Sequence, residues 1–312
     1  MNNKIHDFVI IGGGVAGSTV ALYLSRAGYK PIIITKGSIG GKLNEIDTIQ
    51  NYVGIKDADG EEVAQNISQQ LEQSGLEYDK DILIDTDVLE VAQYNVNLWE
   101  ILIKNDFSDE TEKVFAKNVI IATGMEKMKL IQVSDSFQHN CVLCDGFMYK
   151  DKEVLVVGGG SSAFTEALEL SKLCSRVTIL SRSENYRAEQ TLIDSIKNSK
   201  NIYLTHGEII NGREYDGKKQ FSIREGNMEY RFTTDGLFTY IGSKPNNDFL
   251  PSYVKKDIFG HIIRDGNKAI SEDGVIENMY VVGDITTTTA KQFGIAIGQA
   301  ISTAIEIIEN FK

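Results

Sequence analysis

The sequence is poor in the residues that mark linkers, export and membrane insertion. Proline occurs only three times in 312 residues, as Pro31, Pro245 and Pro251, which excludes a proline-rich linker. No apolar run approaches the roughly 20 residues that a membrane helix needs. The first apolar run, at 8–11, ends directly in three glycines, whereas the apolar core of a secretory signal is longer. We therefore expect a cytoplasmic protein without a membrane span.

Basic residues are also in the minority. The chain carries 32 Lys and Arg against 44 Asp and Glu, a net charge of −12. Such a surface repels phosphate backbones, and no basic stripe offsets the repulsion, so we expect no nucleic-acid partner. The hydrophobic content of 42% is ordinary for a globular chain, and the length predicts about two domains, each able to bury a core.

A pattern of apolar strand, glycine cluster and helix occurs twice. The first copy has a strand at 7–11, a helix at 15–27 and a strand at 31–35; the second has them at 154–157, 161–173 and 176–180. A β-α-β unit of this kind opens a parallel, doubly wound sheet. We therefore predict an α/β chain with two Rossmann-like dinucleotide-binding domains of three-layer β/β/α architecture.

The remaining segments divide the chain between these domains. Sequence pattern predicts a loop at 36–54, a helix at 60–74, antiparallel strands over 81–117 with a turn near Asp109, buried strands at 119–121 and 279–282, strands over 202–241 and a helix at 290–310. The chain is expected to cross between domains near 125–126 and 242–244. One domain, 1–125 with 243–312, is then discontinuous, and 126–242 forms the other.

Both glycine clusters fit a dinucleotide-binding fingerprint. Residues 12–17 read G-x-G-x-x-G and residues 158–163 read G-x-G-x-x-A, each between a strand and a helix. Glycines allow a tight turn and close approach of a pyrophosphate, and the helix N-terminus offers free N–H groups. One match would be weak evidence, because glycines often only make turns; two in this setting favour nucleotide binding.

The ribose-binding acid that often follows such loops is missing from both units, since the second strands end at Thr35 and Ser181. Arg182 and Arg187 follow the second of these strands. Guanidinium groups suit a 2′-phosphate, which favours NADPH. The alternative is that both arginines are solvated surface residues.

The cysteines allow three interpretations. Cys141 and Cys144 form C-x-x-C, while Cys174 stands apart. A zinc site would need further ligands, of which only His139 and Cys174 are near, so we predict no metal. Two inert buried cysteines are possible, and we expect Cys174 to be inert. A redox pair is favoured, with Asp145 beside it able to exchange protons with the thiols; Asp145 could instead be a turn residue before Gly146.

At this point the chain resembles the low-molecular-weight, bacterial-type thioredoxin reductases over nearly all of its length. The residues that carry the resemblance are the two glycine loops, Gly40 to Leu43, Asn51-Tyr52, Ala122 to Gly124, Cys141 to Gly146, Arg182 with Tyr186 to Ala188, Gly242 with Lys244 to Asn246, Gly283-Asp284 and Lys291-Gln292. The resemblance implies a homodimeric flavoprotein that passes electrons from NAD(P)H through FAD and a cysteine pair to thioredoxin or a similar protein, one domain rotating against the other.

The resemblance also implies residue roles. FAD would be bound in the discontinuous domain by Gly12, Gly14, Ala16, Gly17, Thr35, Gly41, Leu43, Asn51, Ala122, Thr123, Gly124, Asp284, Lys291 and Gln292. NADPH, or NADH, would be bound in the domain at 126–242 by Gly158, Gly160, Ser161, Ser162, Ala163, Arg182 and Arg187. Cys144 would face the flavin, Cys141 would attack the partner disulfide, and Asp145 would give and take protons.

Departures from the family pattern keep alternatives open. The run Ser181 to Glu184 replaces a family signature of one histidine and two adjacent arginines, so NADH remains possible. The lead into the cysteines is short and carries Asp135, His139 and Asn140 instead of glycines. A ferredoxin-like electron donor or a small-molecule disulfide acceptor is therefore an alternative. A dithiol oxidase using oxygen and a flavin-loaded sensor without turnover are weaker ones.

Overall fold

The computed structural model describes residues 4–46, 49, 52, 54–55, 58–288 and 290–311, apart from the side chains of Leu143 and Cys144. The chain separates into two compact units. Met1–Met125 together with Pro245–Lys312 form unit 1, and Glu126–Lys244 form unit 2. The chain passes from one unit to the other in β7 (Met125–Lys127) and β16 (Ser243–Pro245), two short strands that pair with each other.

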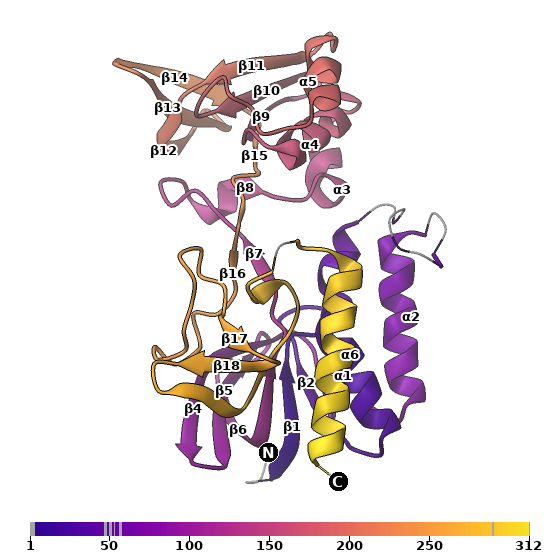
Figure 1. Cartoon of the computed structure of the whole chain (residues 1–312). Helices are drawn as coiled ribbons and strands as arrows, with labels where there is room; N and C mark the ends of the chain where they lie inside the picture. The colour runs from indigo at the N-terminus through magenta and orange to yellow at the C-terminus, as the bar shows by residue number, and fades with distance from the viewer. Residues whose placement is uncertain are drawn as a thin grey trace. The chain divides into compact units, whose positions relative to one another are not determined.

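Unit 1 is built on one mixed sheet (Figure 1). Its path is β17-β18-β19-β6-β1-β2-β3. The strands β19, β6, β1, β2 and β3 are parallel to one another, whereas β17, β18 and β19 pair in antiparallel fashion. A β4–β5 hairpin joins β6 in antiparallel pairing. The strand bounds are β1 Ile5–Ile11, β2 Ile32–Ile34, β3 Ile82–Leu83, β4 Thr86–Asn95, β5 Leu98–Asn105, β6 Thr111–Ile121, β17 Arg264–Asp265, β18 Lys268–Ser271 and β19 Gly274–Val281.

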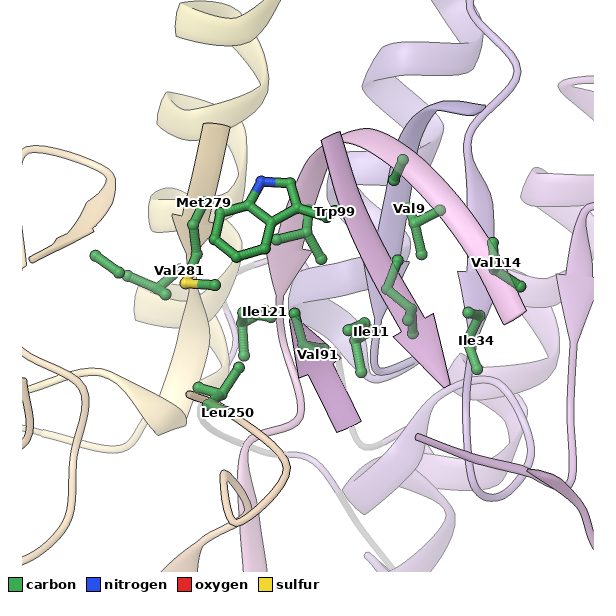
Figure 2. Close-up of a cluster of buried hydrophobic side chains, with 14 of the residues drawn as sticks. Val9, Ile11, Ile34, Val91, Trp99, Val114, Ile121, Leu250, Met279 and Val281 are labelled. Atoms are coloured by element: carbon green, nitrogen blue, oxygen red, sulfur yellow. The ribbon is translucent and has the colours of Figure 1, made fainter. Parts of the chain in front are cut away.

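Alternation along β1 explains the layers of unit 1. Val9 and Ile11 point to one face of the sheet, and Phe8 and Ile10 to the other, as the period of two in a strand requires. Figure 2 shows the first face, where these side chains meet Trp99 of β5 and Met279 of β19. Residues 8–11 are buried on both faces, so this part of the sheet is covered on each side.

The helices of unit 1 cover the Phe8 face. They are α1 (Val15–Arg26), α2 (Gly60–Gln73) and α6 (Phe293–Asn310). Helices α1 and α6 lie side by side against the sheet (Figure 1). In α1 the buried positions Ala16, Val20 and Leu24 recur every four residues, which places them on one side of the helix.

Helix α2 begins with a side-chain cap. The Asp59 carboxylate accepts a hydrogen bond of 2.7 Å from the Glu61 N–H. We expect Asp59→Ala to lower the free energy of unfolding by about 1 kcal/mol, because an N–H of the first turn loses its partner. Asp59→Asn, which keeps an acceptor oxygen, should lower it by less. Urea unfolding followed by circular dichroism measures both; equal losses would show that the cap does not stabilise this helix.

Unit 2 repeats the architecture on a smaller scale. Its main sheet has the order β11-β10-β9-β15-β8, all parallel, and β12, β13 and β14 form a separate antiparallel sheet. The strand bounds are β8 Gln138–His139, β9 Glu153–Val157, β10 Arg176–Ser181, β11 Ile202–His206, β12 Glu208–Tyr215, β13 Lys218–Glu225, β14 Met228–Thr234 and β15 Gly236–Thr239. The helices are α3 (Val142–Asp145), α4 (Ser161–Ser171) and α5 (Gln190–Lys197).

These observations confirm the predicted α/β fold class, with three differences in detail. Within 81–117, where antiparallel strands were predicted, β3 is instead parallel to β2. The buried segment 119–121 is not a separate strand but the end of β6, which starts at Thr111. Helix α3 at the cysteines and helix α5 were not predicted. Among the described helices, none has both the length and the apolar character needed to cross a bilayer.

Candidate functional site

The first glycine loop leaves no room for side chains at two positions. Gly12 has φ +109°, and a Cβ there would lie 2.5 Å from the Ala122 carbonyl oxygen. A Cβ on Gly17 would lie 1.9 Å from the Gly12 carbonyl oxygen. Both glycines are therefore required by close backbone packing between β1, β6 and α1.

At Gly14, in contrast, the structure leaves room for a side chain. Gly14 is the N-cap residue of α1, none of the described side chains caps the helix there, and a Cβ would meet no atom within 4 Å. The free N–H groups of the first turn carry the positive end of the helix dipole. A tight turn, an uncapped helix and open space above the glycine fit the pyrophosphate of a dinucleotide.

A second segment borders this loop. The Gly40 N–H donates to the Gly13 carbonyl over 2.9 Å, and a Cβ on Gly41 would lie 3.1 Å from the Gly14 Cα. Gly41 begins a 3-10 helix, Gly41–Glu45, in which Leu43 is buried. This brings Gly41 beside the glycine loop, where the resemblance implied it would line the same cofactor. Asn51 lies outside the described residues.

The ends of β2 and β6 complete that edge of the sheet. Thr35 is buried directly after β2. The Ala122 N–H donates to the Ile11 carbonyl, and the Thr123 hydroxyl donates to the Asn246 carbonyl over 2.6 Å. Gly124 adopts φ +62°. These residues follow the carboxyl ends of parallel strands, the edge at which open α/β sheets bind ligands.

Asp284 lies at the same edge, directly after β19. A Cβ on Gly283 would lie 3.0 Å from the Ala16 Cβ, which places this turn against the start of α1. The Lys42 ammonium is 3.6 Å from the Asp284 carboxylate, and the Lys291 ammonium donates to the Asp284 carbonyl over 2.7 Å. Burial lowers the pKa of Lys291, although Asp284 opposes the shift. Gln292 is the N-cap residue of α6.

The second glycine loop, in unit 2, has the same construction. Gly158 has φ +152°, and a Cβ there would lie 2.4 Å from the Tyr240 carbonyl oxygen and 2.9 Å from the Ala163 Cβ. Gly160 is the N-cap of α4, again without a side-chain cap among the described residues and without a neighbour within 4 Å of a Cβ. Ser161 and Ser162 form the first turn of that helix.

The two arginines lie beside this loop. The Arg187 N–H donates to the Gly159 carbonyl over 2.7 Å, and the side chains of Arg182 and Arg187 are exposed. Glu184 lies between them in sequence and is 3.8 Å from the His206 ring. The segment thus presents both positive and negative groups after β10, which leaves the choice between NADPH and NADH open.

The cysteine pair stands at the start of α3. The Asp145 N–H donates to the Cys141 carbonyl over 3.1 Å, so these two residues are one helical turn apart. Cys141 is half-buried and disulfide-bonded. Cys174 is free and buried, and burial raises the pKa of its thiol to about 11, which keeps it an unreactive thiol.

The sequence did not predict what surrounds Asp145. His139 bridges two residues: its Nδ1 lies 2.9 Å from Asp145 Oδ2, and its Nε2 lies 2.7 Å from the Tyr149 hydroxyl. The only signals in the sequence are spacings, His139 two residues before Cys141 and Tyr149 four after Asp145.

The sequence analysis also missed Ser18 and Gln299 in unit 1. The Ser18 hydroxyl donates to the Gly13 carbonyl, and the Gln299 side-chain oxygen accepts from the Gly283 N–H.

Residues 6–300 match the family model described as "Pyridine nucleotide-disulphide oxidoreductase". Because the match covers nearly the whole chain, the protein belongs to this family. The pair of glycine loops and the C-x-x-C helix described above agree with that assignment.

Within the family, thioredoxin reductases are among the proteins to which the chain is similar. The chain is 32% identical to that of Mycoplasma genitalium, covering 97% of this chain and 94% of the relative. It is 30% identical to that of Listeria monocytogenes, covering 99% and 96%. The crystal structure of Lactococcus lactis thioredoxin reductase aligns with a TM-score of 0.80 at 26% identity over 98% of each chain. The resemblance inferred from the motifs is thereby confirmed.

Proposed function

We propose that the chain is a thioredoxin-disulfide reductase that uses NAD(P)H and FAD. The observation that carries this proposal is the disulfide-bonded Cys141 at the start of α3, one turn before Asp145 and in the same unit as the second glycine loop. The full-length similarity to thioredoxin reductases supports it.

FAD is assigned to unit 1 and the pyridine nucleotide to unit 2. The open turn at Gly14 suits the pyrophosphate of a dinucleotide. Asp284, at the same edge of the sheet, offers a carboxylate to the hydroxyl groups of a polyhydroxylated chain. The open turn at Gly160 suits the second dinucleotide. When bound, FAD accepts two electrons from the reduced nucleotide and delivers them to a disulfide.

The cysteine pair then performs thiol–disulfide exchange. The Cys141 thiolate attacks the partner disulfide, Cys144 closes the internal disulfide again, and Asp145 exchanges protons with the thiols. Thioredoxin has a potential of about −270 mV, within reach of a pyridine nucleotide. The partner is thus a thioredoxin or a protein like it, in a reducing compartment such as the cytoplasm.

The resemblance further predicts a homodimer. Light scattering of the purified chain tests this prediction.

The test is anaerobic mixing of the holoenzyme with NADPH and, separately, NADH, followed by turnover with an oxidised thioredoxin. Rapid bleaching of the flavin absorbance and steady reduction of thioredoxin are expected. Bleaching without thioredoxin reduction would refute the proposal. The mixed charges after β10 favour one alternative, a protein electron donor; bleaching by neither nucleotide would support that alternative.

The choice of nucleotide depends on Arg182. The family signature has two adjacent arginines, and here Arg182 alone stands in the matching run. A charge-assisted hydrogen bond from Arg182 to the 2′-phosphate should still favour NADPH, because such a bond contributes about 1.5–3 kcal/mol to binding. We expect Arg182→Gln to raise the KM for NADPH about tenfold and to leave that for NADH unchanged. Arg176→Gln is the matched control, since Arg176 stands at the opposite end of β10, 4.3 Å from the Tyr203 ring. Equal changes for both nucleotides would contradict this role.

A further inference from the structure

We propose that His139 is a positioning residue for Asp145, and that Asp145, His139 and Tyr149 form a hydrogen-bonded relay for the protons of thiol–disulfide exchange. The inference rests on the proposed function, because it assigns Asp145 to proton exchange with the cysteine pair. Every contact that carries it lies within unit 2, among described side chains.

The geometry is a continuous chain of three groups. Asp145 Oδ2 lies 2.9 Å from His139 Nδ1, and the Tyr149 hydroxyl lies 2.7 Å from His139 Nε2. Burial, followed by the charges of Asp145 and Asp235, raises the pKa of the Tyr149 hydroxyl, so it keeps its proton at neutral pH. It therefore donates to Nε2 of the neutral ring, which leaves Nδ1–H to donate to the carboxylate.

The surroundings hold this chain in place. His139 is in β8, paired with Phe238 of β15, and the two rings are 5.3 Å apart. The Tyr149 ring packs over Gly236, where a Cβ would lie 2.4 Å from its Cε1 atom. The strand pairing holds His139, and the packing on Gly236 holds Tyr149, so that the His139 ring is kept in one arrangement between the Tyr149 hydroxyl and the Asp145 carboxylate.

Among the contacts of the described side chains, three other charged groups lie near this chain of hydrogen bonds. Asp235 precedes β15 and contributes to the shift at Tyr149, although Lys218 is 3.3 Å from its carboxylate. The Lys152 ammonium is 5.8 Å from the centre of the Tyr149 ring. The Lys127 ammonium donates to the Asn140 carbonyl, next to His139. His139 is thus the titratable group that contacts both Asp145 and Tyr149.

The proton balance of the exchange requires such a group. The Cys141 thiolate attacks one partner sulfur, the partner S–S bond breaks, and the leaving sulfur takes up a proton. The Cys144 thiol then loses its proton and attacks the Cys141 sulfur, which forms the internal disulfide and releases the second partner sulfur. Two electrons pass from the chain to the partner. Of the two protons that the partner takes up, one is that of Cys144 and the other is the one that Cys141 released on becoming a thiolate. Asp145 with His139 accepts the proton of Cys144 and returns it to a leaving sulfur, and histidine is suited to this because it changes charge between pH 5 and 8.

The first test needs neither nucleotide nor partner. Reduced protein is alkylated with iodoacetamide between pH 5 and 9, and the Cys141 peptide is quantified by mass spectrometry. In His139→Gln the Asp145 carboxylate loses the Nδ1–H that partly offsets its negative charge. The Cys141 thiolate, one helical turn away, is then less stable, so the alkylation midpoint should rise by about 0.5–1 pH unit. An unchanged or lower midpoint would overturn the proposal. His261→Gln is the matched control, because His261 pairs with Asp257 over 3.2 Å in unit 1, and its midpoint should not move.

The second test measures single turnover of the reduced holoenzyme with an oxidised thioredoxin. We expect His139→Gln to slow it about tenfold at pH 7. Tyr149→Phe should slow it two- to threefold, since only the outer hydrogen bond is lost. Flavin reduction by the nucleotide should be unchanged in both. Wild-type protein that reduces no thioredoxin would sink the proposed function; variants that match the active wild type would sink only the relay.

A third measurement uses the wild type alone. Long-range ¹H–¹⁵N spectra resolve the ring nitrogens of the four histidines, and the His139→Gln spectrum assigns the signals of His139. The neutral His139 ring should carry its proton on Nδ1. A proton on Nε2 would break the chain of donors from Tyr149 to Asp145 and contradict the relay even if the variants fold poorly.

Discussion

Cys141→Ser should abolish thioredoxin reduction, with a loss of at least about 10³-fold, while the nucleotide still bleaches the flavin at the wild-type rate. A serine hydroxyl is a far weaker nucleophile than a thiolate at neutral pH and cannot form a disulfide. The glycine loops are not altered by this change. Stopped-flow absorbance measures the bleaching, and an insulin-coupled assay measures thioredoxin turnover.

Two companion variants separate the roles of the cysteines. Cys144→Ser should also stop turnover, but because Cys141 remains free to attack, a mixed disulfide with thioredoxin should accumulate and be visible on a non-reducing gel. Cys174→Ala is the control and should turn over normally, since Cys174 is buried with a thiol pKa of about 11. Accumulation of the mixed disulfide in Cys141→Ser instead would reverse the assignment of attacking and resolving cysteine.

Gly17→Ala should yield protein that is colourless and less stable. Its new Cβ would lie 1.9 Å from the Gly12 carbonyl oxygen, an atom of backbone that cannot turn aside, so the loop itself must shift. Forcing atoms into a packed region costs about 1–3 kcal/mol, and the displaced loop can no longer accept a pyrophosphate. Flavin content per chain and thermal melting measure the two effects; full flavin content would place the cofactor elsewhere.

Gly14→Ala distinguishes contact with the cofactor from damage to the fold. At φ −67° and ψ −179° the backbone accommodates alanine, and the new methyl group meets no protein atom within 4 Å. Stability without cofactor should therefore be unchanged, while FAD affinity falls about tenfold or more. Gly298→Ala in α6, also without a neighbour within 4 Å, is the control; it should keep full flavin content and gain about 0.5–1 kcal/mol. Wild-type affinity in Gly14→Ala would rule out a pyrophosphate at this turn.

Local patterns predicted the parts of the fold that depend on local physics. The strand, glycine loop and helix at 5–26 were predictable, because a short apolar run, the glycines and an apolar helical segment follow one another directly in the sequence. The presence of glycine at 12 and 17 now has a steric cause. The cofactor-binding roles implied for Gly12, Gly17, Asp284 and Arg182 remain predictions.

The rest could not be predicted because it depends on contacts between distant segments. His139 looked like a replacement for a glycine-rich lead, and only the pairing of β8 with β15 turns its ring toward Asp145 and Tyr149. Helix α3 has four residues, too few for a hydrophobic period to be read. The packing of Gly283 against Ala16 joins residues from opposite ends of the chain.

The discontinuity of unit 1 sets an order of events during synthesis. The parallel partner of β6 on one side is β19, and the helix beside α1 is α6, both made from the last part of the chain. All of unit 2 is synthesised before these segments. Growing chains fold domain by domain from the N-terminus, so the corner that contains Asp284 cannot be completed until both units have been made. We therefore expect the flavin proposed to bind there to be captured only after unit 2 has been synthesised, and a chain that stopped before β19 would carry its cysteine pair without that corner.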